Sequence, residues 1–114
     1  MNIPEEALLL RIFIGEDDKY EGRPLYRAIV EAARERLLAG ATVLRGPLGF
    51  GKSSRLHTAK ILRLSEGLPL VIEIVDAGEK IEAFVAEHEG MLGGGLVTLE
   101  KVRVVRYADG GSDG

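Results

Sequence analysis

Apolar residues occur along the chain in short runs and in helical stripes that follow one another. The first run, residues 8–14, is apolar except for Arg11 and ends at Gly15, which predicts a buried strand. After a polar stretch, Pro24 occupies a position suited to the first residue of a helix, where a missing N–H costs little. Apolar residues then recur at i, i+4 spacing, so we expect an amphipathic helix that ends at Gly40.

Two further apolar runs predict strands at residues 41–45 and 70–75. The second run is crossed by a single charge, Glu73, which we expect to form a structural ion pair, for example with an arginine at a subunit interface. Between the two runs, residues 58–64 alternate irregularly, and this pattern is compatible with an irregular strand or with a short helix.

The C-terminal part of the chain predicts one more helix and one more strand. Asp76 and Glu79 have the spacing of a capping box, which favours a helix start at this point. The buried stripe of this helix is expected to comprise Ile81, Phe84, Val85, His88 and Leu92. Glycines at 93–95 end the helix, and a last strand is expected at 102–107. The tail 108–114 has the composition of a disordered end.

The predicted order of elements is β-α-β-β-α-β, which is the ferredoxin-like α+β pattern. Two helices are expected to cover one face of a four-stranded antiparallel sheet. The other face also needs cover, because the run 70–75 is apolar on both sides, and another copy of the chain is the simplest cover. The 114 residues are expected to form a single domain, 1–114, with a core at about 7–107.

Composition narrows the classes of function. A net charge of −3 gives no broad attraction to nucleic acid. The chain has no cysteine and only two histidines, which lie on different predicted elements, so we expect no metal site. No signal peptide is recognisable at the N-terminus, and no apolar stretch approaches the roughly 20 residues that span a bilayer. A cytoplasmic protein is therefore expected.

Residues 46–53 satisfy the phosphate-binding pattern G-x-x-x-x-G-K-[ST] in every position. In that pattern glycines bring backbone N–H groups to phosphate oxygens, while the lysine neutralises charge. A P-loop domain, however, needs several parallel strands with intervening helices, and only 38 residues follow Asp76. We therefore interpret the motif as part of a connection between two strands. A connection that binds nothing is an alternative, although the basic residues in and beside it favour an anion: Arg45, Lys52, Arg55, Lys60 and Arg63.

Five segments together carry a family resemblance: LRIFIGE (10–16), GATVLRG (40–46), GFGK (49–52), HTAKILRLS (57–65) and LPLVIEIV (68–75). They resemble the domain of unknown function 190 family, which is grouped with the PII-like signalling proteins. The resemblance covers about residues 8–107. It implies a ferredoxin-like fold and a homotrimer whose sheets pack together in the middle.

The resemblance also implies a function. PII-type proteins bind adenine nucleotides in clefts between subunits, and a long loop between their second and third strands changes shape with ligand and docks on a target. The chain is thus expected to be a signalling protein and not an enzyme, sensing a small anionic metabolite such as an adenine nucleotide through a mobile loop at about 46–60. No cofactor is required. The partner protein is unknown, a membrane transporter being one example. The loop contains no tyrosine, so control by uridylylation is not expected.

The resemblance implies the site residues as well. The sequence GFGK resembles the base of the PII loop, the glycine turn matches a phosphate-binding loop, and two arginines of the last strand resemble a basic pair that reaches phosphates across the subunit boundary. The expected ligand-binding residues are Gly49, Phe50, Gly51, Lys52, Gly93, Gly94, Gly95, Arg103 and Arg106, with further loop contacts at Arg45, His57 and Lys60. No catalytic residue is expected. Two alternatives remain open at this point: a small P-loop-like nucleotide hydrolase, and a structural or metal-responsive trimer that binds no nucleotide.

Overall fold

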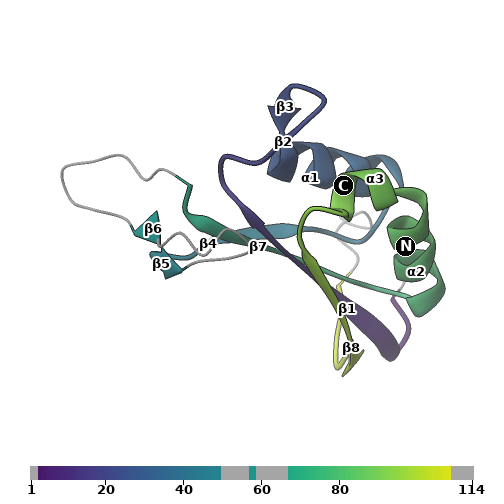
Figure 1. The fold of residues 1–114 in the computed structure, drawn as a ribbon. Coiled ribbons are helices and arrows are strands. Elements are labelled where there is room, and N and C mark those ends of the chain that lie inside the picture. Colours follow the sequence, from purple (N-terminus) through teal and green to yellow (C-terminus); the bar gives the residue numbers. More distant parts are fainter. Residues whose placement is uncertain (1–2, 50–56, 59–66, 109–114) are drawn as a thin grey trace.

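A computed structural model describes residues 3–49, 57–58 and 67–108 of the chain. Its central sheet has four strands: β1 (Glu6–Gly15), β4 (Thr42–Arg45), β7 (Pro69–Asp76) and β8 (Leu96–Arg103). They lie in the order β4-β7-β1-β8, and each neighbouring pair is antiparallel (Figure 1). The long apolar strands β1 and β7 occupy the two central positions, where both of their edges are hydrogen-bonded.

Helices cover one face of this sheet, namely α1 (Leu25–Glu35), α2 (Gly78–Glu87) and the short α3 (Glu89–Leu92) (Figure 1). Alternate residues of the central strands point to this face, as the twofold period of a strand requires. The buried core cluster joins them to the helices: Leu10, Ile12, Ile14, Leu25, Ile29, Ala32, Ala33, Leu38, Leu70, Ile72, Ile74, Ile81, Phe84 and Leu92. The predicted α+β fold, with four antiparallel strands and helices on one face, is confirmed.

Two short hairpins extend from this framework. Strands β2 (Lys19–Tyr20) and β3 (Arg23–Pro24) form one of them, and β5 (Leu48–Gly49) and β6 (His57–Thr58) form the other. The second hairpin stands beyond the end of the sheet next to β4 (Figure 1). The phosphate-binding pattern 46–53 thus begins in an antiparallel hairpin. Every strand pairing in the described part of the chain is antiparallel, which is not the parallel sheet of a P-loop domain.

Helix α1 ends well before Gly40, the residue expected to stop it. Leu37 instead adopts the left-handed conformation, with φ of 61°. The N–H of Leu38 donates to the Ala33 carbonyl at 3.1 Å, which closes the helix in a Schellman pattern. The prediction is wrong because Leu38 is buried in the core, so that packing turns the chain at a leucine where local preference favours glycine.

Helix α2 begins after Ala77, and no side chain caps its N-terminus. The predicted capping box is therefore wrong in detail. The Asp76 carboxylate is buried, and its Oδ2 accepts the backbone N–H of Ala39 at 2.9 Å while its Oδ1 accepts that of Ala77 at 2.7 Å. Lys80 Nζ lies 3.6 Å from the same Oδ2. Asp76 thus ties the chain after α1 to the start of α2.

The last strand lies earlier in the sequence than predicted. Strand β8 begins directly after the glycine turn and ends at Arg103, whereas residues 102–107 were expected. The reason is the length of its partner: Arg103 pairs with Glu6, the first residue of β1, and only one further backbone hydrogen bond, from Val104 N–H to the Glu5 carbonyl, follows this pair. Arg106 consequently lies beyond the strand.

Candidate functional site

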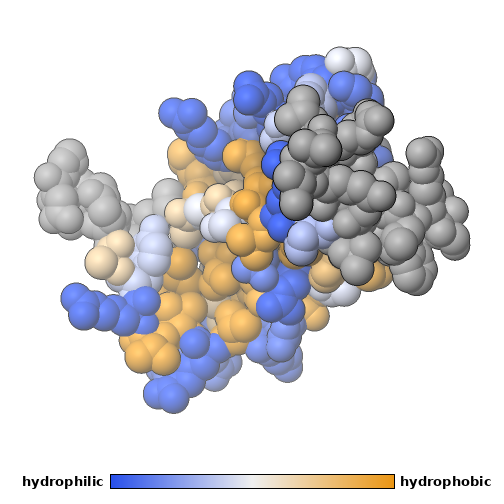
Figure 2. Space-filling view, turned by 90° about the vertical axis from the view of Figure 1, so that its left-hand side faces the viewer, coloured by the Kyte–Doolittle hydropathy of each residue, from blue (hydrophilic) through white to orange (hydrophobic). Residues whose placement is uncertain are grey.

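The sheet face opposite the helices carries an apolar row. Leu44, Val71, Phe13 and Leu96 are consecutive cross-strand partners from β4, β7, β1 and β8, so they lie side by side on this face. Phe13 is 36%, Leu44 48% and Leu96 59% exposed. In the space-filling view of Figure 2, apolar side chains form a continuous area bordered by hydrophilic ones, in keeping with such a row. The expectation that this face needs cover agrees with these exposures.

An ion-pair group occupies the next position along the same face. Arg11 Nε donates to Glu73 Oε2 at 3.0 Å, and Arg11 Nη1 donates to Glu100 Oε1 at 3.2 Å. The hydrogen bond that Arg11 donates to Glu73, together with the charges of both carboxylates, raises the pKa of the Arg11 guanidinium above its ordinary value. The arginine predicted for Glu73 is thus Arg11 of the same chain.

Candidate loop residues gather at one end of the sheet. The N–H of Gly46, directly after β4, donates to the Pro69 carbonyl at 2.8 Å. Arg45 Nη2 lies 2.5 Å from Glu16 Oε2, and the backbone N–H of Glu16 donates to the Leu68 carbonyl at 2.8 Å. The Arg45 side chain, a predicted loop contact, therefore forms an ion pair at the point where the loop hairpin leaves the sheet.

The glycine turn lies at this same end, because Leu96 pairs with Phe13 near the end of β1. A Cβ atom on Gly95 would lie 2.6 Å from the Phe13 carbonyl oxygen and 2.8 Å from Ile14 Cγ2, distances that real Cβ atoms do not adopt. A Cβ atom on Gly94 would meet nothing within 4 Å. Close packing on β1 explains why position 95 requires a glycine, whereas Gly94 lies open to solvent.

The predicted basic pair lies at the opposite end of the sheet. Arg103 Nε donates to Glu5 Oε2 at 2.8 Å, and both side chains are well exposed. The backbone N–H of Val104 donates to the Glu5 carbonyl at 2.7 Å, which holds the two segments together. A hollow of about 330 Å³ is found here, lined by Ile3, Glu5, Arg103, Val104, Val105, Arg106 and Tyr107. The structure thus brings Arg103 and Arg106 together.

Within one chain, those expected ligand-binding residues that the structure describes do not form one site. Strand β8 separates the glycine turn from Arg103 by its full length, roughly 23 Å at about 3.3 Å per residue. Gly49 and His57 pair with each other across the β5–β6 hairpin. Phe50, Gly51, Lys52 and Lys60 lie outside the described residues.

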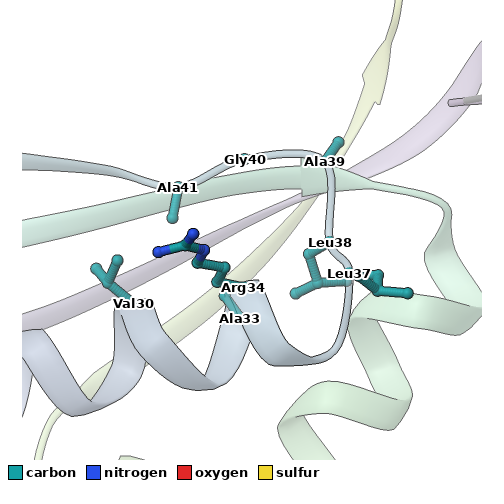
Figure 3. Close-up of a pocket in the computed structure, with 8 residues that line it drawn as sticks. All are labelled: Val30, Ala33, Arg34, Leu37, Leu38, Ala39, Gly40 and Ala41. Atoms are coloured by element: carbon teal, nitrogen blue, oxygen red, sulfur yellow. The ribbon is translucent and has the colours of Figure 1, made fainter. Parts of the chain in front are cut away.

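A second hollow, of about 390 Å³, lies between α1 and the chain that leads to β4 (Figure 3). It is lined by Val30, Ala33, Arg34, Leu37, Leu38, Ala39, Gly40 and Ala41. The walls are apolar except for Arg34, whose guanidinium extends between Val30 and Ala41 in Figure 3. None of the expected site residues lines this hollow.

Histidine and acidic residues give no candidate metal centre in the described part of the chain, where no three of them are grouped to hold an ion. His88 is half-buried, and its Nδ1 lies 2.8 Å from the Phe84 carbonyl oxygen. Its ring also packs on the Phe84 ring, with centroids 4.4 Å apart. This agrees with the place of His88 on the buried stripe of the predicted helix. The described helices include none that is long and apolar enough to cross a membrane.

Comparison with protein families identifies the family of this chain. Residues 7–104 match the model of DUF190, described as an uncharacterized ACR. The chain belongs to the DUF190 family. A UPF0166 protein of Aquifex aeolicus is 46% identical over 97 residues, which are 85% of this chain and 91% of that protein. A UPF0166 protein of Methanocaldococcus jannaschii is 32% identical, with 89% and 94% covered.

Solved structures with the same fold include PII-like proteins. CPII, a nitrogen regulatory PII-like protein from Thiomonas intermedia bound to ADP, AMP and bicarbonate, has a TM-score of 0.66 at 13% identity, with 89% of this chain and 90% of that chain covered. A PII-like signaling protein described as putative, from Thermus thermophilus, has a TM-score of 0.62 at 21% identity, with 93% and 95% covered. The divalent cation tolerance protein CutA1 of the same organism has a TM-score of 0.51 at 13% identity, with 95% of this chain and 91% of that chain covered. These likenesses show that the chain has the fold shared by PII-like proteins and CutA1.

Proposed function

We propose that this chain is a PII-like regulatory protein that binds an adenine nucleotide, or a similar small anion, between the subunits of a homotrimer. The observation that carries the proposal is the position of the candidate residues. Glycines and Arg45 lie at one end of the sheet, and Arg103 and Arg106 lie at the other. One subunit cannot bring the two groups onto one ligand, whereas two adjacent subunits can.

The open face of the sheet supports assembly. Phe13, Leu44 and Leu96 place apolar area on a face that no part of the described chain covers. Burial of such area stabilises association by about 25 cal/mol per Å² before the costs of assembly. Packing of three such faces around a common axis removes this area from water and sets the end of one sheet beside the neighbouring subunit.

The glycine turn and the arginines supply the chemistry that a phosphate group needs, namely backbone N–H groups and guanidinium donors. Lys52 of the GFGK sequence adds a further positive charge. Binding of a ligand there changes the conformation of the segment 46–60, and that segment controls a partner protein in the cytoplasm. CPII, a protein of the same fold bound to ADP and AMP, makes adenine nucleotides the first ligands to test. This role involves no chemical turnover.

Calorimetric titration with AMP, ADP, ATP and cyclic nucleotides tests the proposal. We expect binding of at least one of these ligands. Lys52→Ala and Arg103→Ala should weaken it by about tenfold or more each, because a hydrogen bond to a charged group contributes about 1.5–3 kcal/mol. Arg23→Ala is the matched control, because Arg23 pairs with Glu31 beside the helices. Absence of binding at millimolar ligand would remove the proposed function, and steady phosphate release lost in Lys52→Ala would replace it by nucleotide hydrolysis.

A further inference from the structure

The hollow at the C-terminal end of β8 contains a carboxylate among the groups expected to bind an anion. Glu5 lines this hollow together with Arg103 and Arg106. Its Oε2 accepts the Nε–H of Arg103 at 2.8 Å. The described residues offer Arg106 no ion pair at all. Among the residues that the structure describes, one of the two arginines is thus neutralised and the other is not.

The position of Glu5 is determined by the backbone as well as by the ion pair. Its carbonyl oxygen accepts the N–H of Val104 at 2.7 Å, which continues the β1–β8 pairing by one step beyond Glu6 and Arg103. This pairing fixes the main chain of Glu5 beside β8, so the Glu5 carboxylate remains within reach of the Arg103 guanidinium.

The bond occupies a particular edge of the guanidinium. A bidentate complex with a phosphate commonly uses Nε and one Nη group as a fork, and Glu5 already holds Nε. A phosphate that binds this fork must take the place of the Glu5 carboxylate, and it then lies next to a like charge. Both effects reduce the affinity for an anion.

We propose that Glu5 is an internal counter-ion that opposes anion binding in this hollow, and that a phosphate group displaces its carboxylate from Arg103 on binding. The inference rests on the proposed function, since it concerns the affinity of the same site. Glu5 thereby sets the affinity at a lower value than the two arginines alone would give. Such a residue keeps a sensor responsive to changes in ligand concentration, because the site is not saturated at low ligand.

The size of the effect follows from the exposure of the pair. The side chains of Arg103 and Glu5 are 76% and 63% exposed. Competition from their ion pair therefore lowers the affinity for a ligand by a factor of no more than about five. Repulsion between the Glu5 charge and a phosphate in water adds a similar or smaller factor. Glu5→Gln should therefore tighten the binding of ADP by about 3- to 10-fold at low salt. The gain should shrink towards twofold at about 0.5 M salt, where exposed charges are screened.

The experiment is a calorimetric titration of ADP into the wild-type protein, Glu5→Gln, Arg103→Ala and the double variant, at low and high salt. Glu31→Gln is the matched control, since Glu31 also forms an exposed ion pair, with Arg23 at 3.0 Å, and does not line the hollow. We expect this control to bind as the wild type does. In the Arg103→Ala background the gain from Glu5→Gln should be smaller, because no guanidinium is left to release.

Different results separate the two proposals. If the wild type binds ADP and Glu5→Gln binds it equally or more weakly, Glu5 does not oppose the ligand and this inference is wrong, while the proposed function stands. An equal gain with and without Arg103 likewise overturns displacement from that arginine. If neither the wild type nor Glu5→Gln binds AMP, ADP, ATP or a cyclic nucleotide at millimolar concentration, the proposed function itself is lost.

Discussion

Substitution of Gly95 by alanine should destabilise the fold, while the same change at the adjacent Gly94 should not. The Cβ atom of an alanine at 95 would lie 2.6 Å from the carbonyl oxygen of Phe13 and 2.8 Å from Ile14 Cγ2. Phe13 lies in the strand β1, which is paired on both edges. The backbone there cannot move aside without loss of sheet hydrogen bonds, so the clash has no inexpensive relief.

The magnitude can be worked out from these contacts. Overpacking of this kind costs about 1–3 kcal/mol. Replacement of glycine by alanine returns about 0.4–1 kcal/mol, because the unfolded chain loses conformational freedom. Gly95→Ala should therefore lower the free energy of unfolding by about 1–2 kcal/mol. Gly94→Ala, whose Cβ atom would meet nothing within 4 Å, should change it by less than about 0.5 kcal/mol.

Thermal unfolding followed by circular dichroism measures the difference, at one protein concentration because an oligomer's Tm depends on it. For a domain of this size 1 kcal/mol corresponds to roughly 4–6 °C, so Gly95→Ala should melt about 5–10 °C below Gly94→Ala. Equal Tm values for the two variants would refute the close-packing explanation of Gly95. Equal stability combined with a loss of ADP binding only in Gly95→Ala would assign that glycine to the ligand instead.

Three further changes test other parts of the structure. Asp76→Ala should lower the free energy of unfolding by about 2–4 kcal/mol in chemical denaturation, because two backbone N–H groups lose a buried acceptor. The control Glu79→Ala, at an exposed position, should lower it by less than about 0.5 kcal/mol. Similar losses for the two variants would contradict this explanation. Leu37→Asn should raise the free energy of unfolding by about 0.5–1 kcal/mol, because asparagine tolerates the left-handed φ better and the leucine is 65% exposed. A less stable variant would show that Leu37 packs in the assembly. Phe13→Glu should convert the proposed trimer to monomers in light scattering, whereas Leu37→Asn should leave the mass unchanged; an unchanged mass for Phe13→Glu would refute the proposed interface.

The candidate site shows where prediction from the sequence stops. The resemblance named Arg103 and the glycine turn together, but nothing local reveals that β8 holds them at opposite ends of the sheet. The ion pair between Glu5 and Arg103 was not predicted either, because the two residues are 98 positions apart and only the β1–β8 pairing brings them together. No pattern in the residues around Glu5 signals an ion pair of that separation.

Element type and order followed from the sequence, since burial imposes a period on each segment. The apolar runs at 8–14 and 70–75 became the central strands β1 and β7, and the i, i+4 stripe after Pro24 became α1. Such periods depend only on which side of a segment faces the core, and neighbouring residues carry that information.

Only the tertiary structure decided where elements end and which polar groups meet. Strand β8 ends at Arg103 because β1 begins at Glu6, and α1 ends at a left-handed Leu37 because Leu38 enters the core. Asp76 accepts the N–H of Ala39 and does not cap α2. In each case the partner is distant in the sequence or belongs to the core, and the free energy of that contact outweighs the local preference.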